Sequence, residues 1–163
     1  MLFSDDLTDF ASEILDKARQ AGLKIATAES CTGGLVAGCL TEIPGSSDVV
    51  ERGFVVYSND AKTELLGVSM NVIAEHGAVS AEVARALAEG AIAWSHADLS
   101  VSITGIAGPG GGSNEKSVGL VYFGAMRKGQ EPIVERHEFG DIGRSNVRLA
   151  SVKVALRLLS GLL

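Results

Sequence analysis

The chain has 163 residues, of which 46% are hydrophobic and 21% charged, a composition typical of one globular domain rather than of a disordered chain. Its net charge of −6 comes without any block of basic residues, which excludes nucleic-acid binding through a broad basic surface but leaves room for a small anionic ligand. No apolar run reaches about 18 residues, and the first residues lack a signal-peptide pattern. We therefore expect a cytoplasmic protein with no membrane partner.

Apolar periodicity along the chain predicts helices that alternate with strands. Gly22 is expected to end the first helix, Asn59 or Asp60 to cap a short one, and Ser80 to cap the clearest one. Helices are expected over 7–21, 35–41, 61–66, 71–75, 80–93 and 143–159, and strands over 24–28, 49–58, 99–104, 117–125 and 132–139. Two adjacent strands follow the alternating part, so we predict an α/β fold over residues 1–163: a single-domain three-layer α/β/α sandwich with a mixed, mainly parallel sheet.

The most informative segment, residues 27–34, joins the first predicted strand to a helix. Ser30 falls on this strand-to-helix turn, where the carboxyl end of a strand faces a crevice and the following helix offers free N–H groups. Thr32, Gly33 and Gly34 come directly after it. Their N–H groups could form an oxyanion hole or bind a phosphate, but glycine pairs also let a helix pack closely on a sheet, and the sequence leaves both interpretations open.

A serine hydroxyl needs a base to act as a nucleophile. The three histidines, His76, His96 and His137, are expected at helix ends or on a late strand, away from Ser30. Lys62, in the first turn of a short helix, could serve if burial and the helix dipole keep its amine neutral. Tyr57, at the end of the preceding strand, could bridge or orient the pair through its hydroxyl. The alternative is that Ser30 is only a helix cap and Lys62 a surface charge.

The glycine-rich loop over 104–112 follows a strand and contains Thr104, Gly105 and Gly108. It could bring backbone close to a ligand or simply be a mobile surface loop, and it matches neither a dinucleotide fingerprint nor a phosphate-binding P-loop. Arg144 and Arg148 share one helix face and could clamp a phosphate or form surface ion pairs.

The two cysteines, Cys31 and Cys39, are expected on one helix about 12 Å apart, too far for a disulfide, as in a protein with reduced thiols. Cys31 is an alternative nucleophile to Ser30, although a buried thiol is the commoner role. No pair of cysteines or histidines has metal-ligand spacing in a predicted loop, so no metal is expected.

Taken together, these segments resemble the C-terminal domain of the CinA proteins, whose stand-alone members are nicotinamide-nucleotide amidases. The resemblance covers nearly the whole chain, and one departure is that Ser117 stands where a proline often follows the lysine, here Lys116. The matching segments, in the family's order, are residues 28–34, 53–62, 77–80, 104–112, 118–121 and 144–148.

The resemblance implies hydrolysis of nicotinamide mononucleotide to nicotinate mononucleotide and ammonia, in pyridine-nucleotide salvage. It implies a nucleophilic Ser30 activated by Lys62, with no metal and no cofactor, and a homo-oligomer, since oligomers are common in the family. We expect Tyr57 to assist proton transfer. The oxyanion and the nucleotide, including its phosphate, would be bound by Thr32, Gly33, Gly34, Thr104, Gly105, Gly108 and Arg148.

Two alternatives belong to other functional classes. One is a non-catalytic module that binds a nucleotide or phosphate, in which Ser30 is a cap and Lys62 contacts the phosphate. The other is a regulatory or assembly domain whose apolar C-terminal helix, over 143–159, packs against another copy of the chain rather than against its own sheet.

Overall fold

Short β-branched and apolar segments of the chain form one five-stranded sheet in the computed structural model, which describes residues 2–163. The strands are β1 (Ile25–Glu29), β2 (Val50–Val55), β3 (Leu99–Gly105), β4 (Leu120–Arg127) and β5 (Ile133–Glu138), in the order β2-β1-β3-β4-β5. β1 pairs in parallel with β2 and β3, whereas β4 is antiparallel to both β3 and β5. Only β4 therefore runs against the other strands.

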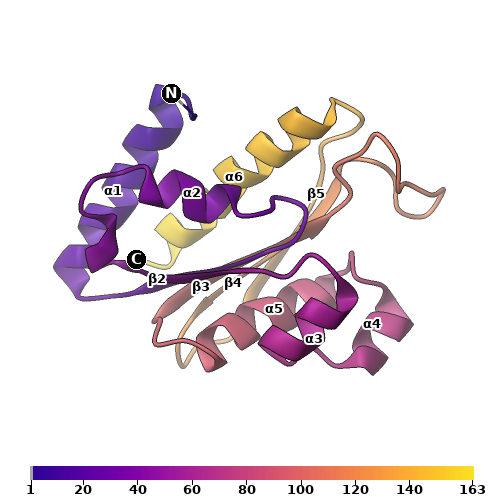
Figure 1. The fold of residues 1–163 in the computed structure, drawn as a ribbon, viewed down its shortest axis with the longest axis horizontal. Helices are drawn as coiled ribbons and strands as arrows, with labels where there is room; N and C mark the ends of the chain where they lie inside the picture. Colours follow the sequence, from indigo (N-terminus) through magenta and orange to yellow (C-terminus); the bar gives the residue numbers. More distant parts are fainter. Residues whose placement is uncertain (1) are drawn as a thin grey trace.

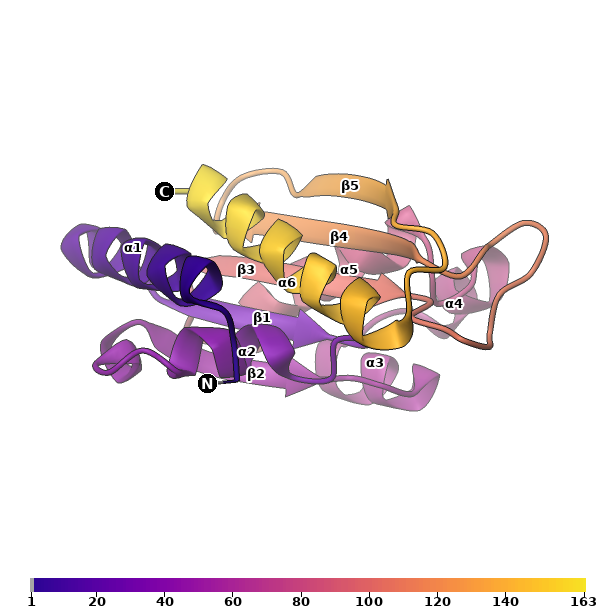
Figure 2. The same cartoon turned by 90° about the horizontal axis from the view of Figure 1, so that it is seen from above.

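Helices cover both faces of this sheet. One layer consists of α1 (Asp5–Ala21), α2 (Leu35–Thr41) and α6 (Arg144–Gly161), and the other of α3 (Asn59–Leu66), α4 (Met70–His76) and α5 (Ala81–Ala93) (Figure 1). Figure 2 looks onto the first layer, where α6 lies beside α1 above the sheet. The predicted three-layer α/β fold with a mixed sheet is confirmed. Within residues 2–163, every helix is too short or too polar to cross a membrane.

The two faces of β3 carry side chains of different size. The apolar core under α1, α2 and α6 takes Leu99, Val101 and Ile103. The opposite face carries Ser100 and Ser102, whose hydroxyls donate to backbone carbonyls of α5 at 2.8 and 2.6 Å. A Cβ on the neighbouring Gly124 would lie 2.4 Å from the Ala84 carbonyl oxygen of that helix, the acceptor of the Ser102 hydroxyl. Small residues thus let α5 lie close against the sheet.

Four local predictions need correction. β2 ends at Val55 rather than at residue 58, because its partner strand β1 ends at Glu29, so Tyr57 follows the strand. Ser58, not Asn59 or Asp60, caps α3, because its extended backbone lets its Oγ accept a hydrogen bond from the Ala61 N–H at 3.0 Å. β4 begins at Leu120 rather than at residue 117, because the Leu120 N–H closes a turn onto the Ser117 carbonyl at 3.1 Å. The fourth correction concerns Cys31, which precedes α2 instead of lying on it.

Candidate active site

Ser30 directly follows β1 at the carboxyl edge of the sheet. Its N–H donates to the Ile103 carbonyl of β3 at 2.9 Å, and its own carbonyl accepts from the Gly33 N–H at 3.0 Å. Gly33 and Gly34 take positive φ angles of 59° and 100°, which glycine adopts without strain. β1 lies between β2 and β3, and the helices that follow β1 and β2 cover opposite faces of the sheet. Ser30 therefore sits at a topological switch point, where α/β proteins form ligand crevices.

Lys62 is the largest fully buried side chain of the described chain. Its Nζ lies 3.2 Å from Ser30 Oγ and also donates to the backbone carbonyls of Val56 at 3.0 Å and Tyr57 at 3.2 Å. α3 starts where β2 has left the sheet, so the fourth residue of this helix points back at the turn after β1. Burial lowers the pKa of Lys62 below its ordinary value. A neutral amine in this position can accept the Ser30 proton.

The amino end of α2 is occupied by a side chain of the protein itself. The fully buried carboxylate of Glu29 accepts hydrogen bonds from the N–H groups of Val36 at 2.8 Å and Ala37 at 3.1 Å. The helix N–H groups that we expected to face a ligand are therefore taken by Glu29. Glu29 is a residue that our reasoning from sequence missed, although it directly precedes Ser30.

Other donors of the turn remain free. Within residues 2–163, the N–H groups of Cys31, Thr32 and Gly34 have no hydrogen-bond acceptor, and the buried hydroxyl of Thr32 has no partner either. The Gly33 N–H, by contrast, is bonded to the Ser30 carbonyl. The donors available for an oxyanion are consequently those that flank Gly33 rather than Gly33 itself.

Both arginines of α6 reach this region, with different partners. Arg148 donates from Nε to the Cys31 carbonyl and from Nη2 to the Thr32 carbonyl, both at 3.1 Å. Arg144 donates to the Gly108 carbonyl at 2.9 Å and to the Tyr57 hydroxyl at 3.1 Å. Arg148 thus supports the turn after Ser30, whereas the exposed Arg144 joins the Tyr57 side chain to the glycine-rich loop.

A pocket of about 220 Å³ opens beside the Ser30 hydroxyl. Thr104 lies in its wall, and its hydroxyl donates to the Ala78 carbonyl at 2.7 Å. Five of the residues predicted to bind the substrate do not line the pocket: Thr32, Gly33, Gly34, Gly108 and Arg148. The pocket is lined by Ser30, Cys31, Tyr57, Asn59, Lys62, Ala78, Val79, Thr104 and Gly105. The pocket therefore gathers five of the ten predicted site residues, Ser30, Tyr57, Lys62, Thr104 and Gly105. It adds Asn59, Ala78 and Val79, of which the last two belong to a segment singled out only by family resemblance.

The Cys31 thiol also lines this pocket, but burial raises its pKa to about 11, which keeps it protonated and poorly nucleophilic at neutral pH. The free Cys39 thiol is buried in α2. Across residues 2–163, no group of three histidine, cysteine or acidic side chains has an arrangement that could hold a metal ion.

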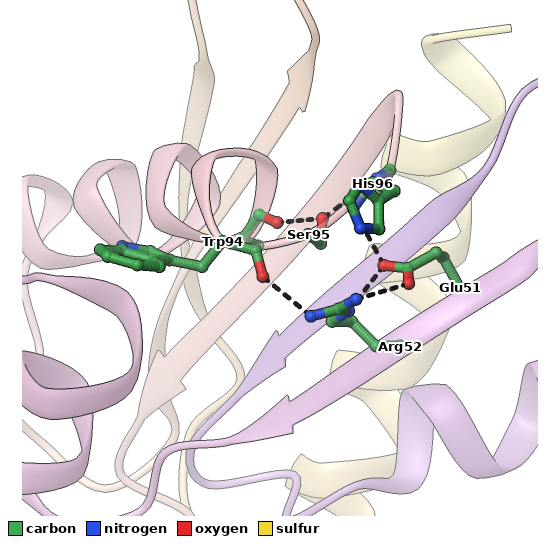
Figure 3. Close-up of polar contacts among 7 residues, drawn as sticks. Glu51, Arg52, Trp94, Ser95 and His96 are labelled. Atoms are coloured by element: carbon green, nitrogen blue, oxygen red, sulfur yellow. Dashed lines mark hydrogen bonds and ion pairs between the residues drawn. The ribbon is translucent and has the colours of Figure 1, made fainter.

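The three histidines contact other parts of the molecule. The backbone N–H of His96 donates to the Glu51 carboxylate, which also binds Arg52 (Figure 3). Glu51 lies near the start of β2, at the edge of the sheet opposite the one that carries Ser30. The His137 ring bonds to Glu135 on β5 at 2.8 Å, and the His76 ring lies near Glu82 at 3.5 Å. The Ser30 hydroxyl instead lies within hydrogen-bond distance of Lys62 Nζ, at 3.2 Å.

Comparison with known proteins gives one family. The family description "CinA C-terminal domain" matches residues 7–163. The chain is 52% identical over 138 residues to a "Putative competence-damage inducible protein" of Caldicellulosiruptor bescii, covering 84% of this chain and 33% of that protein. It is 48% identical to a "CinA-like protein" of Mycolicibacterium paratuberculosis, covering 99% of this chain and 38% of that protein. The chain thus spans about a third of the length of these relatives.

Solved structures agree with this assignment. The competence/damage inducible protein CihA of Agrobacterium tumefaciens has a TM-score of 0.98 and 49% identity, with 99% of this chain and 98% of that chain covered. A CinA superfamily protein of Escherichia coli has a TM-score of 0.91 and 33% identity, with 99% and 94% covered.

Proposed function

Because this chain belongs to the CinA C-terminal domain family, we propose that it is an amidohydrolase that converts nicotinamide mononucleotide to nicotinate mononucleotide and ammonia, in pyridine-nucleotide salvage. The observation that carries the proposal is the buried Nζ of Lys62, 3.2 Å from Ser30 Oγ in a pocket at the carboxyl edge of the sheet. A lysine deprived of water beside a serine is an arrangement that activates a nucleophile. We propose that this pocket of about 220 Å³ receives the flat carboxamide end of the nucleotide.

The first half of the reaction acylates the serine. Neutral Lys62 takes the proton of Ser30 Oγ, and the oxygen attacks the carboxamide carbon. The N–H groups of Cys31, Thr32 and Gly34, which are free of protein partners within residues 2–163, are the candidates to stabilise the oxyanion. Lys62 then returns the proton to the departing nitrogen, so that the C–N bond breaks and ammonia leaves.

The second half releases the acid. Water gives a proton to Lys62 and attacks the acyl carbon, the bond to Ser30 Oγ breaks, and the proton returns to that oxygen. We assign Tyr57 two supporting roles in both halves: its carbonyl orients Lys62, and its hydroxyl holds Arg144.

The phosphate of the nucleotide needs a cationic partner near the pocket. Arg144 suits this role better than Arg148, because it is exposed and bound to the Tyr57 hydroxyl at the pocket. The guanidinium of Arg148 is already bonded to two carbonyls of the turn. We therefore propose Arg144 as the phosphate contact and Arg148 as the support of the oxyanion donors.

Ammonia release from nicotinamide mononucleotide tests the proposal. We expect turnover by the wild-type protein and a loss of roughly 10⁴-fold or more in both Ser30→Ala and Lys62→Ala, because a nucleophile and its base act as a unit. The exposed residues Ser47 and Lys17 provide matched controls, and Ser47→Ala and Lys17→Ala should retain full activity. A fully active Ser30→Ala protein would exclude the mechanism.

A second candidate is a module that binds the nucleotide without hydrolysing it. It is favoured by the free N–H groups around Gly33, which suit a phosphate as well as an oxyanion. Nucleotide binding measured by calorimetry, without ammonia release and with equal affinity in Ser30→Ala, would support this candidate over the amidase.

A further inference from the structure

One wall of the pocket consists of backbone that belongs to no helix or strand. Residues 77–80 connect α4 to α5, and Ala78 and Val79 of this segment line the pocket. The carbonyls of residues 76–79 all accept hydrogen bonds from side chains. Lys116 Nζ donates to the His76 and Val79 carbonyls at 2.6 and 2.7 Å, Ser80 Oγ to the Gly77 carbonyl at 2.8 Å, and Thr104 Oγ1 to the Ala78 carbonyl at 2.7 Å. Side chains therefore fix the course of this wall.

Lys116 differs from the other two donors because it comes from a long loop. It lies between β3 and β4, 37 and 40 positions away from the residues whose carbonyls it binds. The loop is closed locally, since the Ser113 N–H donates to the Lys116 carbonyl at 2.8 Å and the Lys116 N–H donates to Ser113 Oγ at 3.0 Å. The lysine is thus presented by a defined turn.

Gly77 is shaped to receive this ammonium group. Its φ angle is +79°, and a Cβ at this position would lie 2.8 Å from Lys116 Nζ. A glycine therefore leaves the space through which the lysine reaches the carbonyls on both sides. Hydrogen bonds from a charged donor are stronger than neutral ones, so this contact constrains the wall more than the two hydroxyls do.

We propose that Lys116 is a positioning residue for the reaction pocket: its ammonium group bridges the carbonyls of His76 and Val79 and holds residues 77–79 in the shape that receives the substrate. Lys116 does not line the pocket, so it acts through Ala78 and Val79. Without the ammonium, water can solvate the two carbonyls but cannot tie them together. The kinetic consequence rests on the proposed amidase function, whereas the effect on the wall does not.

The experiment compares Lys116→Met, which keeps the length of the side chain but not the donors, with Lys116→Arg, whose guanidinium can donate to both carbonyls. Lys128→Met, at an exposed lysine on the turn after β4, is the matched control. Two quantities are measured in each full-length protein: hydrogen exchange of the backbone amides of residues 77–80, and kcat and KM for nicotinamide mononucleotide.

In Lys116→Met we expect faster exchange at residues 77–80 and a KM raised about tenfold with kcat changed less than threefold, since a wall displaced by a fraction of an ångström weakens binding first. Lys116→Arg should restore both quantities, and Lys128→Met should match the wild type. If Lys116→Met does not fold, Lys116→Gln is measured in its place. Its shorter side chain reaches only one of the two carbonyls, so we expect a KM between the wild-type value and about ten times that value.

The proposal would be overturned if Lys116→Met, or Lys116→Gln measured in its place, showed the same amide exchange and the same KM as the wild-type protein. The two hypotheses fail separately. If the wild-type protein releases no ammonia, the amidase proposal fails, while the exchange measurement still tests whether Lys116 holds the wall.

Discussion

At the scale of single residues, the unusual feature is a buried lysine that has no carboxylate partner among residues 2–163. Lys62 Nζ contacts a hydroxyl and two carbonyls, which are dipoles and leave its charge uncompensated. Burial of such a charge costs free energy and favours the neutral amine. Lys62 can therefore act as the proposed base because burial disfavours its charged form and leaves a neutral amine that can accept a proton.

This placement links stability to pH. The pKa of Lys62 is lower in the folded chain than its ordinary value of 10.5. Between these two pKa values the unfolded chain binds more protons, so this residue makes the free energy of unfolding rise with pH. We expect Lys62→Met, which cannot titrate, to gain most over the wild type at pH 7 and to lose this advantage towards pH 10.

Urea unfolding of both proteins at pH 7, 8.5 and 10 measures this difference. The exposed variant Lys17→Met should follow the wild-type slope at each pH. A difference between Lys62→Met and the wild type that stays constant or grows with pH would contradict the assignment of Lys62 as a buried, easily neutralised amine.

At the scale of secondary-structure elements, α2 depends on an internal anion. It is a helix of seven residues whose N-cap is Gly34 without a side-chain cap, and Glu29 on β1 supplies the missing acceptor for two of its N–H groups. The same carboxylate ties the helix to the strand that ends at Ser30. The stability of the helix and the position of the nucleophile are therefore coupled.

We expect Glu29→Gln to lower the free energy of unfolding by about 2 kcal/mol, because an amide replaces a carboxylate that accepts from one buried and one half-buried N–H group. For a chain of this size the melting temperature should fall by roughly 4–8 °C. Calorimetry checks this, with Glu64→Gln on the exposed side of α3 as the control. A Glu29→Gln protein as stable as the wild type would show that the carboxylate does not hold the helix.

Sequence patterns located the elements well and their connections less well. The long amphipathic helices were predicted because one face must be apolar, as in α1, whose described ends differ from the prediction only at the first turn. The cap of α3 was wrong because Ser58, Asn59 and Asp60 are all good capping residues and only the backbone conformation selects among them. The late start of β4 depends on a local turn, in which the Leu120 N–H donates to the Ser117 carbonyl, and apolar periodicity does not report such a turn.

At the scale of the whole molecule, the pocket is assembled from segments that are far apart in the chain. Ser30 and Lys62 were paired from sequence because a serine nucleophile needs a base and no histidine was expected beside Ser30. The family resemblance implies the same pair. The partners of the two arginines could not be predicted, since Arg144 and Arg148 occupy equivalent positions on one helix face. Packing of α6 against the turn after β1 decides which arginine binds the carbonyls of that turn and which stays exposed at the Tyr57 hydroxyl. The catalytic and binding roles of these residues stay predictions.

The division of roles between the arginines can be measured with two substrates. Arg144→Gln should raise KM for nicotinamide mononucleotide about tenfold or more but leave KM for the phosphate-free riboside unchanged, because only the first substrate carries the group that the guanidinium binds. Arg148→Gln should lower kcat for both substrates, because the oxyanion donors move. Equal effects of Arg144→Gln on both substrates would remove Arg144 from the phosphate site.

The contacts of Arg148 also have a consequence for how the protein is made. The carbonyls that it binds belong to Cys31 and Thr32, which precede it in the chain by 117 and 116 positions. On the ribosome, the turn that carries the nucleophile emerges long before the helix that supports it. The nascent chain therefore holds an incomplete reaction centre until α6 has been synthesised, and the amidase we propose would become active only when this helix has left the exit tunnel.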